Sequence, residues 1–139
     1  MAKGLSLHIG LDAVDPKHYA GWDGQLNACE ADAKDMASIA QSRGFTAQTL
    51  LTNKAMRSTV KSALADAAGT LNSGDIYFLS YSGHGGQVPD QSGDEADGED
   101  ETWCLFDGEL IDDELYQALG KFKAGVRIID AARRRTCET

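Results

Sequence analysis

The chain is short of cysteine, proline and positive charge. It has three cysteines and two prolines in 139 residues, and 13 Lys and Arg against 22 Asp and Glu give a net charge of −9. An odd number of cysteines in unrelated contexts does not form a disulfide framework, which favours a reducing compartment. The acidic balance argues against nucleic-acid binding, because phosphate contacts need a basic face. It suits a cationic partner, either a basic peptide or a metal ion.

Long apolar runs are absent as well. No stretch is long enough to span a membrane, and polar residues interrupt the first 12 residues, which therefore lack the apolar region of a signal peptide. We expect a cytoplasmic protein with no membrane partner. The length corresponds to one domain with a core of its own.

What stands out is the stretch 75–86, with the sequence DIYFLSYSGHGG. Its apolar, aromatic-rich first half predicts a strand covered on both faces. The run stops at His84, which stands between glycines. In open α/β sheets the carboxyl ends of strands are where ligands bind, and flanking glycines let a substrate backbone approach. His84 is therefore a candidate catalytic residue, although a turn whose histidine only caps the strand would read the same way.

Strand and helix patterns alternate before this stretch. We expect strands at 5–11 and 45–51 and helices at 27–43 and from 52 or 53 to 68. Asn27 is the predicted N-cap of the first helix. His8, inside the first strand, is interpreted as a structural side chain. The alternation predicts right-handed crossovers and an α/β fold with a parallel sheet.

The second half begins with an acidic segment, 87–102, for which we expect a loop. Carboxylates of such a segment are either solvated or hold a hard cation. An EF-hand is disfavoured because Glu95 stands where that loop needs glycine. A strand at 103–106, a helix at 112–119 and a strand ending at Ile129 follow. Residues 131–139 are polar and show no strand pattern, so we divide the chain into a domain at 1–130 and an Arg-rich tail at 131–139.

Three segments together resemble the caspase-like cysteine peptidases, in particular the metacaspase and bacterial orthocaspase branch. They are LNACEADA at 26–33, YSGHGG at 81–86, and DGEDE at 97–101 followed by LIDDEL at 110–115. They occur in the family's order, and the resemblance extends over nearly all of 5–129. It implies a three-layer α/β fold, with helices on both faces of a mainly parallel sheet and the carboxyl-terminal part missing.

The resemblance also implies roles for single residues. His84 matches the general base of the family's Cys/His dyad, and Cys29, Asp32 and Ser82 match residues that line the pocket for the substrate's P1 side chain. In metacaspases this pocket is acidic and selects Arg or Lys, which agrees with the pairing of carboxylates and basic groups.

A calcium site is the third implied feature. Asp100, Asp112 and Asp113 match carboxylates that bind an activating calcium ion in calcium-dependent members. Clustered carboxylates repel one another unless a cation joins them.

The sequence departs from the family at the nucleophile. The family places a cysteine in an Asp-Ser-Cys-His-Ser-Gly type of motif at the end of the strand beside the histidine's strand. Here that strand leads into DAARRR at 130–135, Cys137 lies well past it, and Cys104 is predicted to be buried. A histidine without its thiolate cannot carry out covalent acyl transfer. We therefore expect a cysteine endopeptidase domain for basic residues that is inactive in this form.

Two alternatives remain open at this point. The first is a non-catalytic caspase-fold protein that binds a basic peptide or calcium through Asp32 and the acidic segment. The second is a generic α/β small-molecule binder, for which the sequence offers no dinucleotide-binding or phosphate-binding glycine motif.

Overall fold

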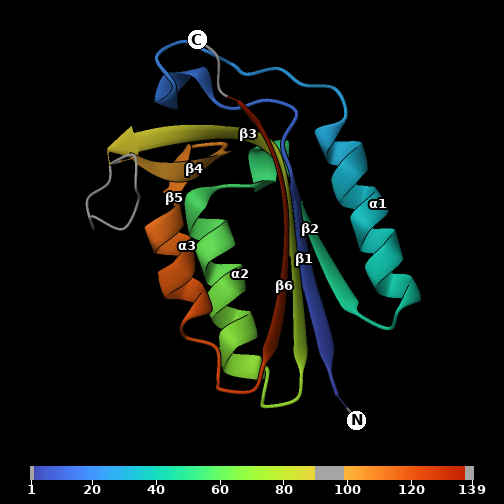
Figure 1. Ribbon diagram of the computed structural model, residues 1–139. Coiled ribbons are helices and arrows are strands. Elements are labelled where there is room, and N and C mark those ends of the chain that lie inside the picture. Colours follow the sequence, from blue (N-terminus) through green and yellow to red (C-terminus); the bar gives the residue numbers. More distant parts are fainter. Residues whose placement is uncertain (1, 90–98, 137–139) are drawn as a thin grey trace.

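The computed structural model describes residues 2–89 and 99–136, and the side chains of 2–86 and 102–132. Its centre is a six-stranded sheet in the order β2-β1-β3-β4-β5, with β6 paired to β3 (Figure 1). β1 pairs in parallel with β2 and β3, and β3 pairs in parallel with β6, whereas the β3–β4 and β4–β5 pairs are antiparallel. The strands are β1 (Gly4–Gly10), β2 (Thr46–Leu51), β3 (Ile76–Pro89), β4 (Glu99–Leu105), β5 (Gly108–Ile111) and β6 (Arg127–Thr136).

Helices cover both faces of this sheet. α1 (Cys29–Ser42) lies on one face, and α2 (Arg57–Thr70) and α3 (Asp112–Leu119) lie together on the other (Figure 1). Two short 3-10 turns, Pro16–His18 and Thr52–Lys54, sit in the connections. The prediction of a three-layer α/β fold with a mainly parallel sheet is confirmed. No helix among residues 2–89 and 99–136 has the length and apolar content needed to cross a bilayer.

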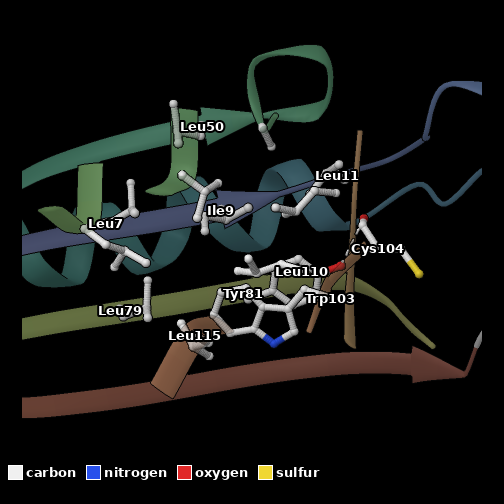
Figure 2. Close-up of a cluster of buried hydrophobic side chains, with 14 of the residues drawn as sticks. Leu7, Ile9, Leu11, Leu50, Leu79, Tyr81, Trp103, Cys104, Leu110 and Leu115 are labelled. Atoms are coloured by element: carbon white, nitrogen blue, oxygen red, sulfur yellow. Dashed lines mark hydrogen bonds between the residues drawn. The ribbon is translucent and has the colours of Figure 1, made fainter. Parts of the chain in front are cut away.

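The main apolar core lies between the sheet and the α2–α3 layer. Alternate residues of β1 point into it, and the rings of Tyr81 and Trp103 stack there with centroids 4.5 Å apart and planes 2° from parallel. Burying one large apolar side chain contributes roughly 1.5–3 kcal/mol, so this cluster holds the ends of β3 and β4 together. Figure 2 shows its members, which include Leu7, Ile9, Leu11, Leu79, Leu110 and Leu115.

The α1 face of the same strands carries polar groups. His8 is fully buried, with Nδ1 2.7 Å from Oγ of Ser80 and Nε2 2.9 Å from Oγ of Ser6. Burial lowers the pKa of His8 from 6.5 to about 4, because a charged imidazole would lose its hydration. His8 is therefore a neutral structural side chain, as predicted.

Both long helices start differently from the prediction. α1 begins at Cys29 without Asn27 as its cap, because Oδ1 of Asp12 accepts the N–H groups of Cys29 (2.8 Å) and Glu30 (3.3 Å). α2 begins only at Arg57, whose N–H donates to Oδ1 of Asp107 at 2.8 Å. A helix starts where its first N–H groups find acceptors, and here distant loops supply them.

Three strand predictions need correction. β3 and β4 pair at 85–89 and 99–103, where a loop was expected from 87 to 102; β5 was not predicted; and β6 continues past Ile129 to Thr136. Backbone pairing, with β3 for β4 and β6 and with β4 for β5, satisfies the N–H and C=O groups whatever the polarity of the side chains. Side-chain patterns therefore underestimate these strands.

Candidate active site and substrate recess

His84 occupies the point at which β3 changes partners. The parallel ladder between β3 and β1 ends at Ser82, opposite Gly10, and the antiparallel ladder with β4 starts at Gly85, opposite Trp103. His84 was predicted to lie just past the strand, but it is inside a longer one. It still lies at the carboxyl edge of the parallel part, where α/β proteins bind ligands.

The imidazole of His84 is held from one side. Its Nε2 lies 3.0 Å from the carbonyl oxygen of Gly24. A carbonyl oxygen can only accept, so Nε2 carries the hydrogen in this arrangement. Trp22 packs against the ring with centroids 4.7 Å apart and planes at 62°. The other nitrogen, Nδ1, is buried and has no hydrogen-bond partner among the described residues. A buried unpaired nitrogen is uncommon, and in the neutral ring it has the lone pair that a general base needs.

The backbone next to His84 is also anchored. Burial raises the pKa of Tyr81, so its hydroxyl stays protonated and donates to the carbonyl of His84 at 2.6 Å. After His84, the N–H of Gly86 donates to Oγ1 of Thr102 at 3.1 Å, and that hydroxyl donates to Glu109 at 3.0 Å. Thr102 is fully buried. His84 therefore lies on a segment that is fixed at both ends.

A recess of about 280 Å³ opens beside this strand. Within it Oγ of Ser82 donates a hydrogen bond to Oδ2 of Asp32 at 3.0 Å, so α1 and β3 are joined at its floor. Two of the three predicted pocket residues are thus brought together. The lining residues come from α1, β3 and β6: Asp32, Asp35, Met36, Ser80, Tyr81, Ser82, Ala131 and Ala132.

Asp35 is a lining residue that sequence reasoning missed. It lies one helical turn after Asp32, and the spacing of three residues puts both carboxylates on one side of α1. That spacing was the available signal, but both residues read equally well as the solvated face of a helix. Two carboxylates with apolar walls from Met36 and the alanines favour a long side chain with a cationic end.

Most of the chain matches a known protein family. Residues 13–139 match the caspase domain family, peptidase family C14. The chain belongs to the caspase domain family. That family consists of cysteine peptidases, and the resemblance predicted from the three motifs is confirmed.

Metacaspases are among the relatives of this caspase domain. Metacaspase-1A of Aspergillus clavatus is 35% identical over 141 aligned residues, which cover 91% of this chain and 32% of the relative. Metacaspase-1 of Emericella nidulans is 31% identical over 126 residues, 80% of this chain and 31% of the relative. The domain therefore spans about a third of the length of these curated relatives.

A solved structure is similar as well. The crystal structure of protein GSU0716 from Geobacter sulfurreducens is 64% identical and superimposes with a TM-score of 0.88, covering 97% of this chain and 50% of that chain. The caspase-like architecture is thus shown over nearly the whole domain.

The third predicted pocket residue lies elsewhere. Cys29 is completely buried at the first turn of α1, where its N–H donates to Asp12, and it is not part of the recess lining. There is no space for a side chain on Gly10, because a Cβ there would come within 2.3 Å of the carbonyl oxygen of Cys29. In this caspase domain the start of α1 rests directly on β1.

The strand beside His84 carries no cysteine opposite it. In the β3–β6 register, Arg135 stands opposite His84 and Arg133 opposite Ser82. Cys104 is fully buried in β4, as predicted, and Cys137 lies outside the described residues. The two cysteines that the structure describes, Cys29 and Cys104, are both fully buried, so neither thiol is accessible as a nucleophile.

The predicted calcium ligands are placed only in part. Asp112, which is buried, and the half-buried Asp113 open α3. Thr102 pairs with Ile111, which brings the backbone of Asp100 toward the same end of the β4–β5 pair, but its side chain lies outside the described residues. The described side chains contain no group of three that could hold a metal ion. Carboxylates are the ligands calcium prefers, and the site stays a prediction.

Proposed function

We propose that this caspase domain recognises the Arg or Lys side chain at P1 of a peptide, and that His84 is the general base of a Cys/His dyad. One observation carries the proposal. Asp32 lines a recess and accepts a hydrogen bond from Ser82, which lies on the same strand as His84, two residues before it. Residues two apart in a strand face the same side of the sheet. A substrate residue whose side chain is held in the recess would have its backbone carbonyl group near the imidazole.

The chemistry then follows from the atoms of His84. With Nε2 hydrogen-bonded to Gly24, Nδ1 would take the proton of a thiol, and the resulting thiolate would attack the scissile carbonyl. The proton passes to the leaving amine as the peptide bond breaks, and water then hydrolyses the acyl-enzyme with the same nitrogen as base. Asp32 and Asp35 take no part in this proton transfer. Their role is to select the P1 side chain.

We further propose that this chain binds such peptides without cleaving them. This is supported by Arg135 opposite His84 and by the burial of Cys29 and Cys104. The same observations favour a second function, that of a non-catalytic caspase domain which sequesters basic peptides. The peptidase and the sequestering domain differ in whether a complete protein containing this domain supplies a thiol at the imidazole.

Binding can be tested with fluorescent peptides that differ at one position. A peptide with Arg at P1 is compared with one that carries the uncharged isostere citrulline, by fluorescence anisotropy. We expect at least tenfold tighter binding of the Arg peptide, and at least tenfold loss on Asp32→Asn, because a charge-assisted hydrogen bond contributes about 1.5–3 kcal/mol. The matched control is Asp66→Asn at an exposed position of α2. Equal affinities for Arg and citrulline would refute the assignment of the recess.

Cleavage is tested separately with the Arg peptide and mass spectrometry. No hydrolysis by this chain, together with binding, supports the sequestering function. Hydrolysis that is blocked by iodoacetamide and abolished by His84→Ala would instead show a working dyad. Hydrolysis that His84→Ala leaves unchanged would contradict the role of His84.

A further inference from the structure

The loop between β1 and α1 places an aromatic pair against His84. Trp22 lies edge to face with the imidazole, with centroids 4.7 Å apart, and Tyr19 lies edge to face with Trp22, with centroids 6.0 Å apart. The hydroxyl of Tyr19 donates to the carbonyl of Leu105 at 2.6 Å. The pair therefore links the imidazole to the end of β4.

A single hydrogen bond does not hold an imidazole in one orientation. The torsion that turns a histidine ring is broad and nearly two-fold, so a half-turn would exchange Nδ1 for a ring carbon. Gly24 accepts from Nε2 but contacts only that edge of the ring. Something must also restrain the ring face, and in the described part of the chain Trp22 is the aromatic group that packs there.

Gly24 lies close to both the indole of Trp22 and the ring of His84. A Cβ on Gly24 would meet the indole of Trp22 at 2.8 Å and Cδ2 of His84 at 3.1 Å. The loop is itself pinned, since the N–H of Val14 donates to the carbonyl of Asp23 at 2.8 Å and the N–H of Trp22 donates to the carbonyl of Tyr19 at 3.0 Å. The backbone that carries Trp22 is therefore anchored at residues 22 and 23.

We propose that Trp22 is a positioning residue that keeps His84 in the Nε2–H tautomer, with Nδ1 directed away from Gly24 and available for a proton. Trp22 touches no reacting atom and acts through the imidazole alone. The proposal deepens the proposed function, since it rests on His84 being the base, but its test does not need turnover.

The test is the nitrogen-15 NMR spectrum of the imidazoles in alkaline buffer. In the unaltered chain we expect the His84 ring to show a protonated Nε2 and an unprotonated Nδ1, together with nuclear Overhauser contacts to the indole of Trp22. Trp22→Leu should give a mixture of both tautomers, and Trp22→Phe, which keeps an aromatic ring, should restore the single one. Tyr116→Leu, at an exposed position of α3, is the control.

A single Nε2–H tautomer in Trp22→Leu would overturn the proposal, as would a mixture in Trp22→Phe. If Trp22→Leu does not fold, the unaltered chain decides, because the absence of contacts between the indole and the His84 ring refutes the arrangement. Where a complete protein shows cleavage, Trp22→Leu should lower kcat and leave KM unchanged. If a complete protein that supplies the thiol gives the expected spectrum but cleaves no peptide, the proposed reaction is refuted and the positioning role stands.

Discussion

At the scale of single residues, Gly24 has both a conformational and a steric task. Its φ of +54° lies in the left-handed region, and its missing side chain makes room for Trp22 and His84. Gly21 in the same loop also has positive φ, +90°, but nothing lies within 4 Å of where its Cβ would be. Comparing the two positions therefore separates the cost of a left-handed backbone from the cost of steric crowding.

We expect Gly24→Ala to destabilise the fold more than Gly21→Ala does. Gly21→Ala should cost about 1–2 kcal/mol for the left-handed backbone, and Gly24→Ala should add about 1–3 kcal/mol of overpacking against the two rings. Urea unfolding of both variants measures the difference. Equal losses would show that the loop yields and that the packing on His84 is loose.

His8 gives the stability a pH dependence. Its pKa is lowered to about 4 in the folded chain from 6.5, so below pH 6.5 the unfolded chain binds a proton that the folded chain refuses. The contribution of His8 to the free energy of unfolding is fully present above pH 6.5 and is lost as the pH falls toward 4. The total change is on the order of 3 kcal/mol. His8→Gln should remove this part of the slope in urea unfolding across that range.

His18→Gln is the control for His8→Gln, because the His18 side chain is 50% exposed. A slope that persists in His8→Gln would mean that other groups cause it.

At the residue scale, the sequence pointed to site candidates only where local motifs exist. Asp32, Ser82 and His84 follow from short segments, and the structure brings Asp32 and Ser82 into contact. The contact of Trp22 with His84 could not be predicted, because it depends on how a loop folds back over a strand 62 residues later in the chain. Cys29 shows the reverse case, since its place in a motif did not reveal that it points into the core.

At the scale of elements, helix starts are set from outside the helices. Asp12 follows β1 and caps α1, and Asp107 follows β4 and caps α2. The sequence predicted that the helices exist but located their starts too early, because the rule applied looks for a cap next to the helix. The extents of β3, β4 and β6 were also predicted wrongly, because the residues of a strand do not show which other strand it pairs with.

Asp12→Ala and Asn27→Ala distinguish the structural cap from the predicted one. Asp12→Ala leaves the N–H groups of Cys29 and Glu30 without their acceptor and should cost about 1–2 kcal/mol. Asn27→Ala, at an exposed position before the helix, should change stability by less than about 0.5 kcal/mol. Thermal unfolding followed by circular dichroism measures both. A larger loss for Asn27→Ala would contradict the assignment of the cap.

At the scale of the whole molecule, the net charge of −9 bears on the β4–β5–α3 region, where the predicted calcium ligands lie. Like charges destabilise the compact state through mutual repulsion, and a bound cation would relieve it. The topology, a mainly parallel sheet between two helical layers, was predictable from the order of the patterns. The antiparallel extension of β3 and β4 was not, because its acidic residues look like a solvated loop.

Calcium should raise the melting temperature of this chain if Asp100, Asp112 and Asp113 hold it. Mass action gives about 2.7 kcal/mol when the free ion is at one hundred times its dissociation constant. Differential scanning fluorimetry with calcium and with magnesium measures the shift, and Asp113→Asn should reduce it, while Asp66→Asn should not. No shift at millimolar calcium would refute the site.

The two-residue interval between Ser82 and His84 has a consequence for substrates. Strand geometry puts these positions about 6.6 Å apart along β3. In the proposed function, this spacing sets the distance between the point where a P1 side chain ends and the point where its peptide bond is attacked. A basic residue with a shortened stem, such as ornithine or diaminobutyric acid, would reach the carboxylates only by drawing its carbonyl away from the imidazole. The domain would then distinguish basic side chains by their length as well as by their charge.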